Sequence, residues 1–178
     1  MQKFIRIMAI VATVLIGGSF LLILLSLLFQ RSIATNILGC SAETISCFPQ
    51  IPVPQLLLCF LRLVCVALLI ACCGNKKGGI WVEVIILICL VTVLPGINAI
   101  ISPLYSKLVT YTQGIDAYVA YSTSNTITTF CLIPSGWGTT LAYITCGMSI
   151  AFKHMSKKMD RAVLEAKIGV EEMKELEL

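Results

Sequence analysis

Long apolar stretches alternate with short polar stretches along the whole chain. Residues 7–30 carry no charged side chain, residues 54–75 carry only Arg62, and residues 84–106 carry none. Residues 117–152 are also uncharged, although their first part is rich in Ser and Thr. A helix that crosses a bilayer needs about 20 mainly apolar residues. The pattern therefore predicts four membrane-spanning helices, at about residues 5–29, 55–74, 80–104 and 131–152.

Composition supports a membrane protein. Hydrophobic residues make up 58% of the 178 residues and charged residues only 12%, whereas roughly 25% of the residues in an ordinary soluble domain are charged. The mean hydropathy is +0.95. This small number of charged residues cannot cover that much apolar surface in water. The sequence therefore predicts a single domain that is embedded in lipid.

Basic residues gather at particular ends of the predicted spans. Lys3 and Arg6 precede the first span, Lys76 and Lys77 follow the second, and four more basic residues follow the fourth (Lys153, Lys157, Lys158 and Arg161). Cytoplasmic loops carry an excess of Lys and Arg, so both termini are expected in the cytoplasm, with the plasma membrane as the expected location. The net charge of +4 follows from this topology and predicts membrane lipids, not nucleic acid, as the charged partner.

The expected fold is thus an all-α membrane protein. Residues 1–153 would form a four-transmembrane-helix bundle, and residues 154–178 a cytoplasmic helical tail. Small residues recur every four positions on the fourth span, at Gly138, Ala142 and Cys146, a spacing that lets helices approach closely in lipid. Pro95 and Pro134 are expected to bend or interrupt their helices.

Two cysteines lie in the first predicted outer segment. Cys40 and Cys47 would face an oxidising compartment, where a disulfide can form; the alternatives are two free thiols or a bond from one of them to Cys131. Residues 117–133 contain many β-branched and aromatic residues in partial alternation, which is typical of a strand. Together these features predict a small extracellular β element held by the Cys40–Cys47 disulfide.

The candidate chemistry is sparse. Membrane thiol oxidoreductases combine a four-helix core with outward cysteine pairs, but they need a second close pair. Here Cys131 is the only further cysteine on the outer side, so a second outer pair cannot form. The single histidine, His154, lies at the inner edge of the membrane. The sequence has no carboxylate pair, metal-ligand cluster or phosphate-binding glycine loop. We therefore expect no enzymatic activity, cofactor or metal site, with a thiol oxidoreductase as the least favoured alternative.

Arg62 is the charged residue inside the second predicted span. An arginine at the centre of a membrane helix costs about 2.5–3.5 kcal/mol, so it needs a polar environment. Gln55 lies on the same helix face, and Asn98 and Thr92 on the third span are candidate partners. These four residues are expected to form an intramembrane polar anchor. The alternatives are a pore-lining or ligand-binding arginine and a lipid-facing arginine that extends toward the outer surface.

Cys72 and Cys73 end the second span directly before the sequence GNKK. Cysteines beside the membrane and next to basic residues are candidates for S-palmitoylation. The alternative is that both are ordinary interface cysteines.

The tail has a seven-residue repeat of apolar positions. Met159, Ala166 and Met173 are spaced by seven, and Val163 and Val170 supply the other position of the seam. A stable coiled coil usually needs more repeats, so two interpretations stay open. The tail is either a solvated amphipathic helix or a helix that binds a partner or a second copy.

Several of these features together resemble the claudin-like four-helix group. They are four spans with both ends inside, the cysteine pair in "TNILGCSAETISC", an arginine in the second span and cysteines at the inner end of that span. The Gly-Leu-Trp-like motif of the family is absent, since only Ile37-Leu38-Gly39 precedes Cys40, and the cysteine spacing is shorter. The resemblance implies a membrane organiser or adhesion protein.

The sequence therefore predicts a non-enzymatic integral membrane protein with a structural or interaction role, as a membrane organiser, an adhesion protein or an accessory subunit. Its expected partner is another membrane protein or a second copy. The alternative is a subunit of an oligomeric channel or transporter whose pore would use polar faces such as that of Arg62.

Overall fold

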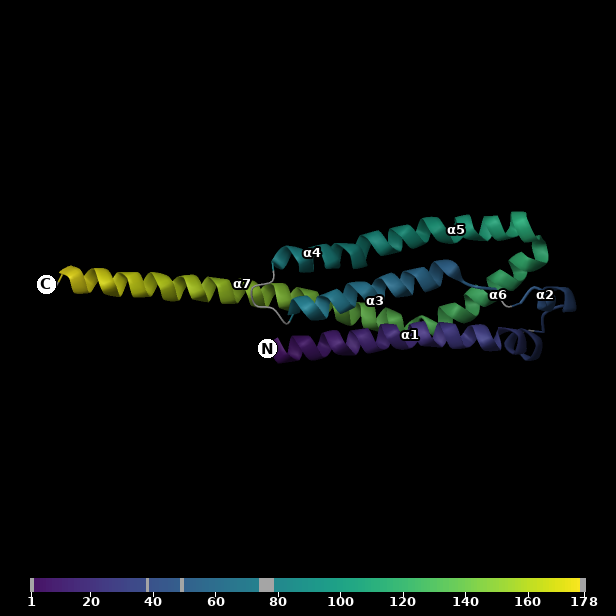
Figure 1. Ribbon diagram of the computed structural model, residues 1–178, viewed down its shortest axis with the longest axis horizontal. Helices are drawn as coiled ribbons and strands as arrows, with labels where there is room; N and C mark the ends of the chain where they lie inside the picture. The colour runs from purple at the N-terminus through teal and green to yellow at the C-terminus, as the bar shows by residue number, and fades with distance from the viewer. Residues whose placement is uncertain (1, 38, 49, 74–78, 177–178) are drawn as a thin grey trace.

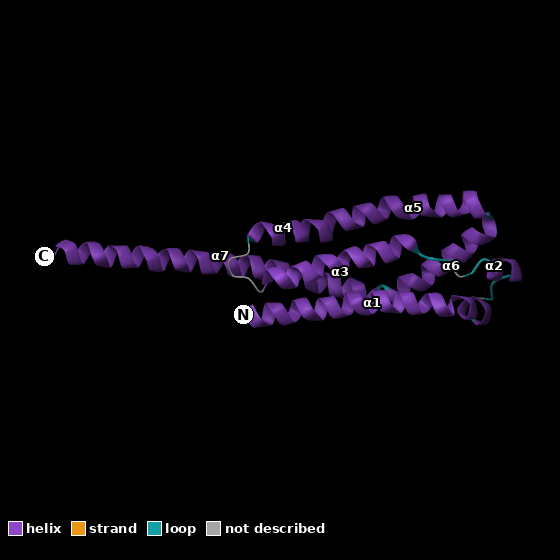
Figure 2. Cartoon of the chain, in the orientation of Figure 1, coloured by secondary structure: helices purple, strands orange, loops and turns teal. Residues whose placement is uncertain are grey.

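The computed structural model describes residues 2–37, 39–48, 50–73 and 79–176, with side chains as far as Ala166. Within these ranges all regular structure is helical (Figure 2). The elements are α1 (Gln2–Asn36), α2 (Ala42–Ser46), α3 (Val53–Cys73), α4 (Ile80–Ile88), the π-helical turn η1 (Cys89–Val93), α5 (Leu94–Gln113), α6 (Ile115–Cys131) and α7 (Ile133–Leu176).

Three helical segments are long and apolar enough to cross a membrane. They are α1, α3 and the continuous run Ile80–Gln113 that joins α4, η1 and α5. These segments correspond to the first three predicted spans. The predicted span at residues 131–152 falls mostly in α7, which is not among the apolar segments found in the described residues. The first part of α7 nevertheless packs along α1, in the same bundle as the other three (Figure 1).

Helix α7 approaches α1 closely at Gly138. A Cβ atom at this position would lie 2.8 Å from Ile16 Cγ1 and 2.9 Å from the backbone oxygen of Ala12. Ala142 and Cys146, on the same face of α7, are fully buried. The small residues at every fourth position therefore form the contact face of α7, as their spacing predicts.

The predicted strand at residues 117–133 is wrong, because these residues form α6 and the start of α7. The buried positions of α6 are spaced by three and four, as on one face of a helix: they are Ala117, Ala120, Tyr121, Ser124 and Thr128. Thr126, Thr128 and Thr129 donate their hydroxyls to carbonyls of their own helix, as Thr128 does to Ser124 at 2.8 Å. Such bonds satisfy the hydroxyls within a helix, so a Thr-rich composition does not require a sheet.

The predicted disulfide is not found in the described residues, where Cys40, Cys47 and Cys131 are all free thiols. The short helix α2 lies between Cys40 and Cys47 in sequence. Both cysteines pack at the edge of a small apolar cluster formed by Ala34, Phe48 and Ala120. This end of the bundle is thus held together by helices and apolar contacts instead of a disulfide-linked β element.

The turn η1 has a local cause in Pro95. In a π-helical turn each N–H bonds to the carbonyl five residues earlier, as the N–H of Leu94 does to Cys89. Pro95 has no N–H, so it cannot bond to the carbonyl of Leu90. The hydroxyl of Tyr143 on α7 donates to that carbonyl instead, at 3.1 Å. The expected interruption at Pro95 is confirmed, and Pro134 likewise lies at the junction of α6 and α7.

Two helices extend beyond the membrane-spanning lengths expected from the sequence. Helix α1 ends at Asn36 and α5 ends at Gln113, which adds roughly two turns to each at 3.6 residues per turn. Helices α2 and α6 lie at this same end of the molecule (Figure 1). The opposite end holds the start of α1, and from there the second part of α7 projects well beyond the bundle (Figure 1).

Candidate functional site

A buried ion pair lies at the end of the bundle where α7 leaves it. Lys153 Nζ on α7 lies 2.9 Å from Glu83 Oε1 on α4, and the Glu83 side chain is fully buried. The hydroxyl of Ser149 donates to the same Oε1 at 2.6 Å. Lys153 also donates to the carbonyl of Cys72 at the end of α3, at 3.3 Å. One ammonium group therefore links three helices.

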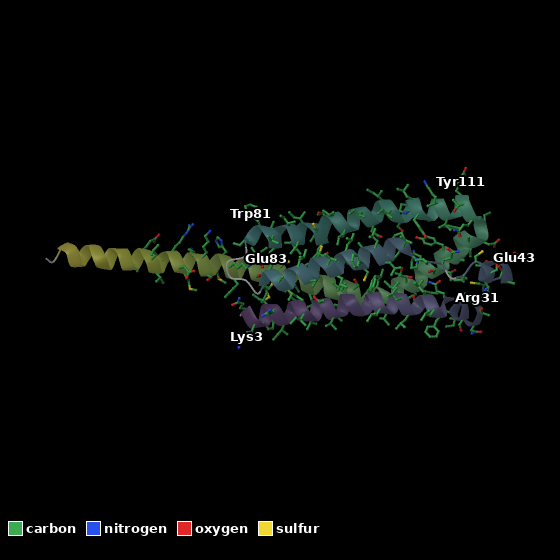
Figure 3. The ribbon with its side chains drawn as sticks, viewed as in Figure 1. Lys3, Arg31, Glu43, Trp81, Glu83 and Tyr111 are labelled. Carbon is green, nitrogen blue, oxygen red and sulfur yellow. The ribbon has the colours of Figure 1, made fainter. Side chains whose placement is uncertain are left out.

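The local sequence explains how these groups meet. Glu83 lies in the first turn of α4, where a negative charge interacts favourably with the helix dipole. Ser149 and Lys153 are four residues apart on α7, so they lie on the same face. Figure 3 shows Glu83, Trp81 and Lys3 at this end of the bundle, and Arg31, Glu43 and Tyr111 at the other. Glu83 Oε2 is buried without a hydrogen-bond partner.

Sequence analysis missed this ion pair. It placed Lys153 after the fourth span but did not identify Glu83 as its partner. One available signal was that Glu83 is the only acidic residue between Glu43 and Asp116. A lone carboxylate at a membrane edge needs a nearby cation, because an unpaired buried charge is costly.

Arg62 lies in the middle of α3, next to Ser135 at the start of α7. The distance from Arg62 Nη1 to Ser135 Oγ is 3.5 Å, at the long limit of a hydrogen bond. Arg62 Nε is buried and has no partner. The neighbouring thiol of Cys59 donates to the carbonyl of Ile16 at 3.5 Å. Arg62 therefore lies at the junction of α1, α3 and α7 with weak polar contacts.

The other three residues of the predicted polar anchor lie elsewhere. Gln55 Nε2 donates to Asn125 Oδ1 on α6. Asn98 lines a small, mainly apolar cavity between α3 and α5, and its Oδ1 is buried without a partner. Thr92 is exposed on η1 and donates to the carbonyl of Ile88. No hydrogen bond joins these residues to one another or to Arg62 within the described structure.

Gln30 organises a second polar cluster at the opposite end of the bundle, near α2. Its Nε2 donates to Ser124 Oγ on α6 at 2.6 Å, and its Oε1 accepts from the backbone N–H of Gln50 at 3.1 Å. Ser124 completes the ring by donating to the carbonyl of Gln50 at 2.8 Å. Gln30 and Ser124 are fully buried. This closed network fixes α1, α6 and the segment before α3 relative to one another.

The two candidate lipidation cysteines differ in environment. Cys73 is buried in the main apolar core, whereas Cys72 is only partly buried and packs against the edge of that core. An acyl transferase needs access to the thiol, so the structure favours Cys72 over Cys73 as an acceptor.

Met159, Val163 and Ala166 are exposed on the projecting part of α7. The side chains of Val170 and Met173 lie outside the described residues. At 100° per residue, Met155, Met159, Val163 and Ala166 fall within an arc of about 80°. We call these four residues the tail stripe. They form a continuous apolar surface on a helix that otherwise carries mainly polar and charged residues in this part.

Comparisons with known proteins give no match. No family model matches the chain, and no curated protein or solved structure is similar to it. These comparisons leave the resemblance to the claudin-like group untested.

Proposed function

We propose that the protein is a non-enzymatic integral membrane protein that acts as an interaction component, and that its partner-binding element is the projecting part of α7. The observation that carries this proposal is the continuity of α7. One helix of 44 residues, about 66 Å at 1.5 Å per residue, runs from the buried interior of the bundle to the exposed tail stripe.

In this proposal the first part of α7 is a fourth membrane crossing. It is less apolar than the other three helices, but four of its polar side chains face the bundle and are buried: Ser135, Thr139, Thr145 and Ser149. Thr139 and Thr145 donate to carbonyls of α7 itself, at 2.7 Å each. A helix whose hydroxyls are satisfied in this way can cross lipid when its neighbours cover its polar face.

An even number of crossings also agrees with the position of the chain ends. The start of α1 and the exit of α7 lie at the same end of the bundle (Figure 1). Exposed basic side chains gather there, namely Lys3, Arg6, Lys157, Lys158 and Arg161. By the positive-inside rule we assign this end to the cytoplasm and the α2 end to the outside. The projecting tail is then cytoplasmic, where it can reach a membrane-bound partner or a second copy.

The tail stripe gives a direct test. Met159 is 66% exposed and Val163 is 57% exposed, so glutamate at either position should leave the bundle intact. Leu164 is 60% exposed but lies about 100° from Val163, outside the stripe. It therefore provides a matched control for the same substitution.

We expect chemical cross-linking in native membranes, followed by sizing in detergent, to show wild-type chain in an assembly larger than the 19.4 kDa monomer. Met159→Glu and Val163→Glu should reduce that assembly, and Leu164→Glu should preserve it. The proposal is refuted by a wild-type chain that remains monomeric in native membranes, or by an assembly that resists both stripe substitutions.

A further inference from the structure

Arg62 lies close to the centre of the proposed membrane region. It comes nine residues after Val53 and eleven before Cys73, the two ends of α3. At 1.5 Å per residue these separations are about 14 and 17 Å, and the hydrocarbon core of a bilayer is about 30 Å thick. The backbone of Arg62 therefore lies about half a membrane away from the headgroups on either side.

No carboxylate within the described residues balances this charge. The one ion pair found there joins Lys153 and Glu83. The only side-chain hydrogen bond of Arg62 is the long one to neutral Ser135, and its Nε remains unpartnered although it is buried. The side chain as a whole is only partly buried. The guanidinium of Arg62 therefore has N–H donors without acceptors. Its positive charge would be strongly stabilised by a nearby anion in this low-dielectric position.

The surrounding side chains add donors and no negative charge. Gly138 contacts Ile16, and α1 and α7 run antiparallel (Figure 1), so Ser19 and Ser135 lie at the same level. Both serines are fully buried, and Ser19 Oγ has no partner. The junction around Arg62 therefore favours an acceptor group supplied from outside the chain.

A second copy of this chain cannot supply a carboxylate at that depth. Glu83 is the only acid between Glu43 and Asp116, and it is buried against Lys153 at the inner end. Glu43 lies at the opposite end of the molecule, on α2 (Figure 3). Asp116 lies at the start of α6, beyond the end of α5. The acid must therefore come from a different protein.

We propose that Arg62 is the docking point for a transmembrane helix of a different membrane protein, and that this helix carries a Glu or Asp near its middle. A guanidinium and a carboxylate form paired hydrogen bonds with matching geometry, and water does not compete in the bilayer interior. The inference rests on the proposed interaction role and names the partner's chemistry. It assigns the chain to a hetero-oligomeric assembly.

The test uses three synthetic helices as probes. Each is a Leu–Ala helix with lysines at both ends; one carries Glu at its centre, the second carries Gln there, and the third carries Glu two turns away from the centre. The full-length protein, fused at its C-terminus to a fluorescent donor, is placed in phosphatidylcholine vesicles with acceptor-labelled probe at pH 8. Energy transfer then reports association in a bilayer without net surface charge.

We expect the central Glu helix to associate about tenfold more tightly than the Gln helix, an effect typical of a polar contact between membrane helices. The shifted Glu helix should lose most of that advantage. Arg62→Gln retains a donor for Ser135 without the charge and should abolish the preference, whereas Arg62→Lys should retain part of it. The comparison among probes needs only wild-type protein, so a variant that misfolds does not weaken the test.

Equal association of the central Glu and Gln helices with the wild-type protein overturns the inference, as does equal association of the central and shifted Glu helices. A lipid-facing arginine predicts the first of these results. Such an outcome leaves the tail proposal standing if Met159→Glu and Val163→Glu still reduce the native assembly. Conversely, loss of the tail effect with a retained Glu preference would refute the role of the tail and keep that of Arg62.

Discussion

Replacing Gly138 with alanine tests a close contact between α1 and α7. The added Cβ would lie 2.8 Å from Ile16 Cγ1, 2.9 Å from the oxygen of Ala12 and 3.1 Å from Leu15 Cβ. Real Cβ contacts are essentially never shorter than 3.0 Å. The Ile16 side chain can shift, but the Ala12 oxygen belongs to the backbone of α1. Gly138→Ala must therefore push α1 and α7 apart.

The size of the effect follows from this separation. An ordinary contact begins at 3.4 Å, so the Ala12 oxygen and the new Cβ must separate by about 0.5 Å more, and a gap of about that size forfeits roughly a quarter of the dispersion energy of each contact. Overpacked sites typically lose about 1–3 kcal/mol. We expect Gly138→Ala to lower the free energy of unfolding by that amount, even though alanine is the better helix former.

Gly147 on the same helix is the matched control. Nothing lies within 4 Å of a Cβ at that position, so Gly147→Ala should be neutral or stabilise the protein by about 0.4–1 kcal/mol. Both variants can be compared with wild type by unfolding in mixed micelles with increasing sodium dodecyl sulfate, followed by tryptophan fluorescence. Trp137 adjoins Gly138 and will report the contact. Equal stability of the two variants would refute the close packing of α1 on α7.

Two further predictions concern polar contacts and use the same unfolding measurement. Glu83→Gln should cost about 3–5 kcal/mol, because it removes the carboxylate that neutralises the Lys153 ammonium group in the interior. The double variant Glu83→Gln/Lys153→Met should recover most of that loss. If the losses of the two single variants simply add, the ion pair is not the cause. Tyr143→Phe should lower the free energy of unfolding by about 1 kcal/mol, because it leaves the carbonyl of Leu90 unpaired in the interior. A variant as stable as wild type would show that this hydrogen bond does not support η1.

The sequence was sufficient to locate the apolar helices. The uncharged runs correspond to α1, to α3 and to the continuous segment Ile80–Gln113, because residues that face lipid must be apolar whatever their neighbours are. The spacing of Gly138, Ala142 and Cys146 also identified the contact face of α7. The helix ends were less accurate, since α1 and α5 continue past residues 29 and 104. Helices can continue beyond the lipid when other elements pack on them, and the apolar pattern does not record this.

The polar contacts could not be predicted from the sequence. Glu83 and Lys153 are separated by 70 residues, and so are Gln55 and Asn125, so no local pattern connects them. The partners proposed for Arg62 were Asn98 and Thr92 on the third span, but Ser135 on α7 is its neighbour. The Thr-rich stretch before Cys131 was misassigned to a strand because its composition resembles one, whereas its hydroxyls are satisfied along a helix. Which side chains meet depends on how the helices pack.

The ion pair joins α7 to two other helices at the point where the tail begins. Helix α7 changes environment at Lys153, from the buried Ser149 to the exposed residues that follow. Lys153 is bonded there to Glu83 on α4 and to the last turn of α3, and no described loop separates the two parts of α7. Lys153 therefore links α7 to α3 and α4 at the point where the helix leaves the bundle. In the proposed interaction role, this link would set the direction in which the tail leaves the bundle toward its partner.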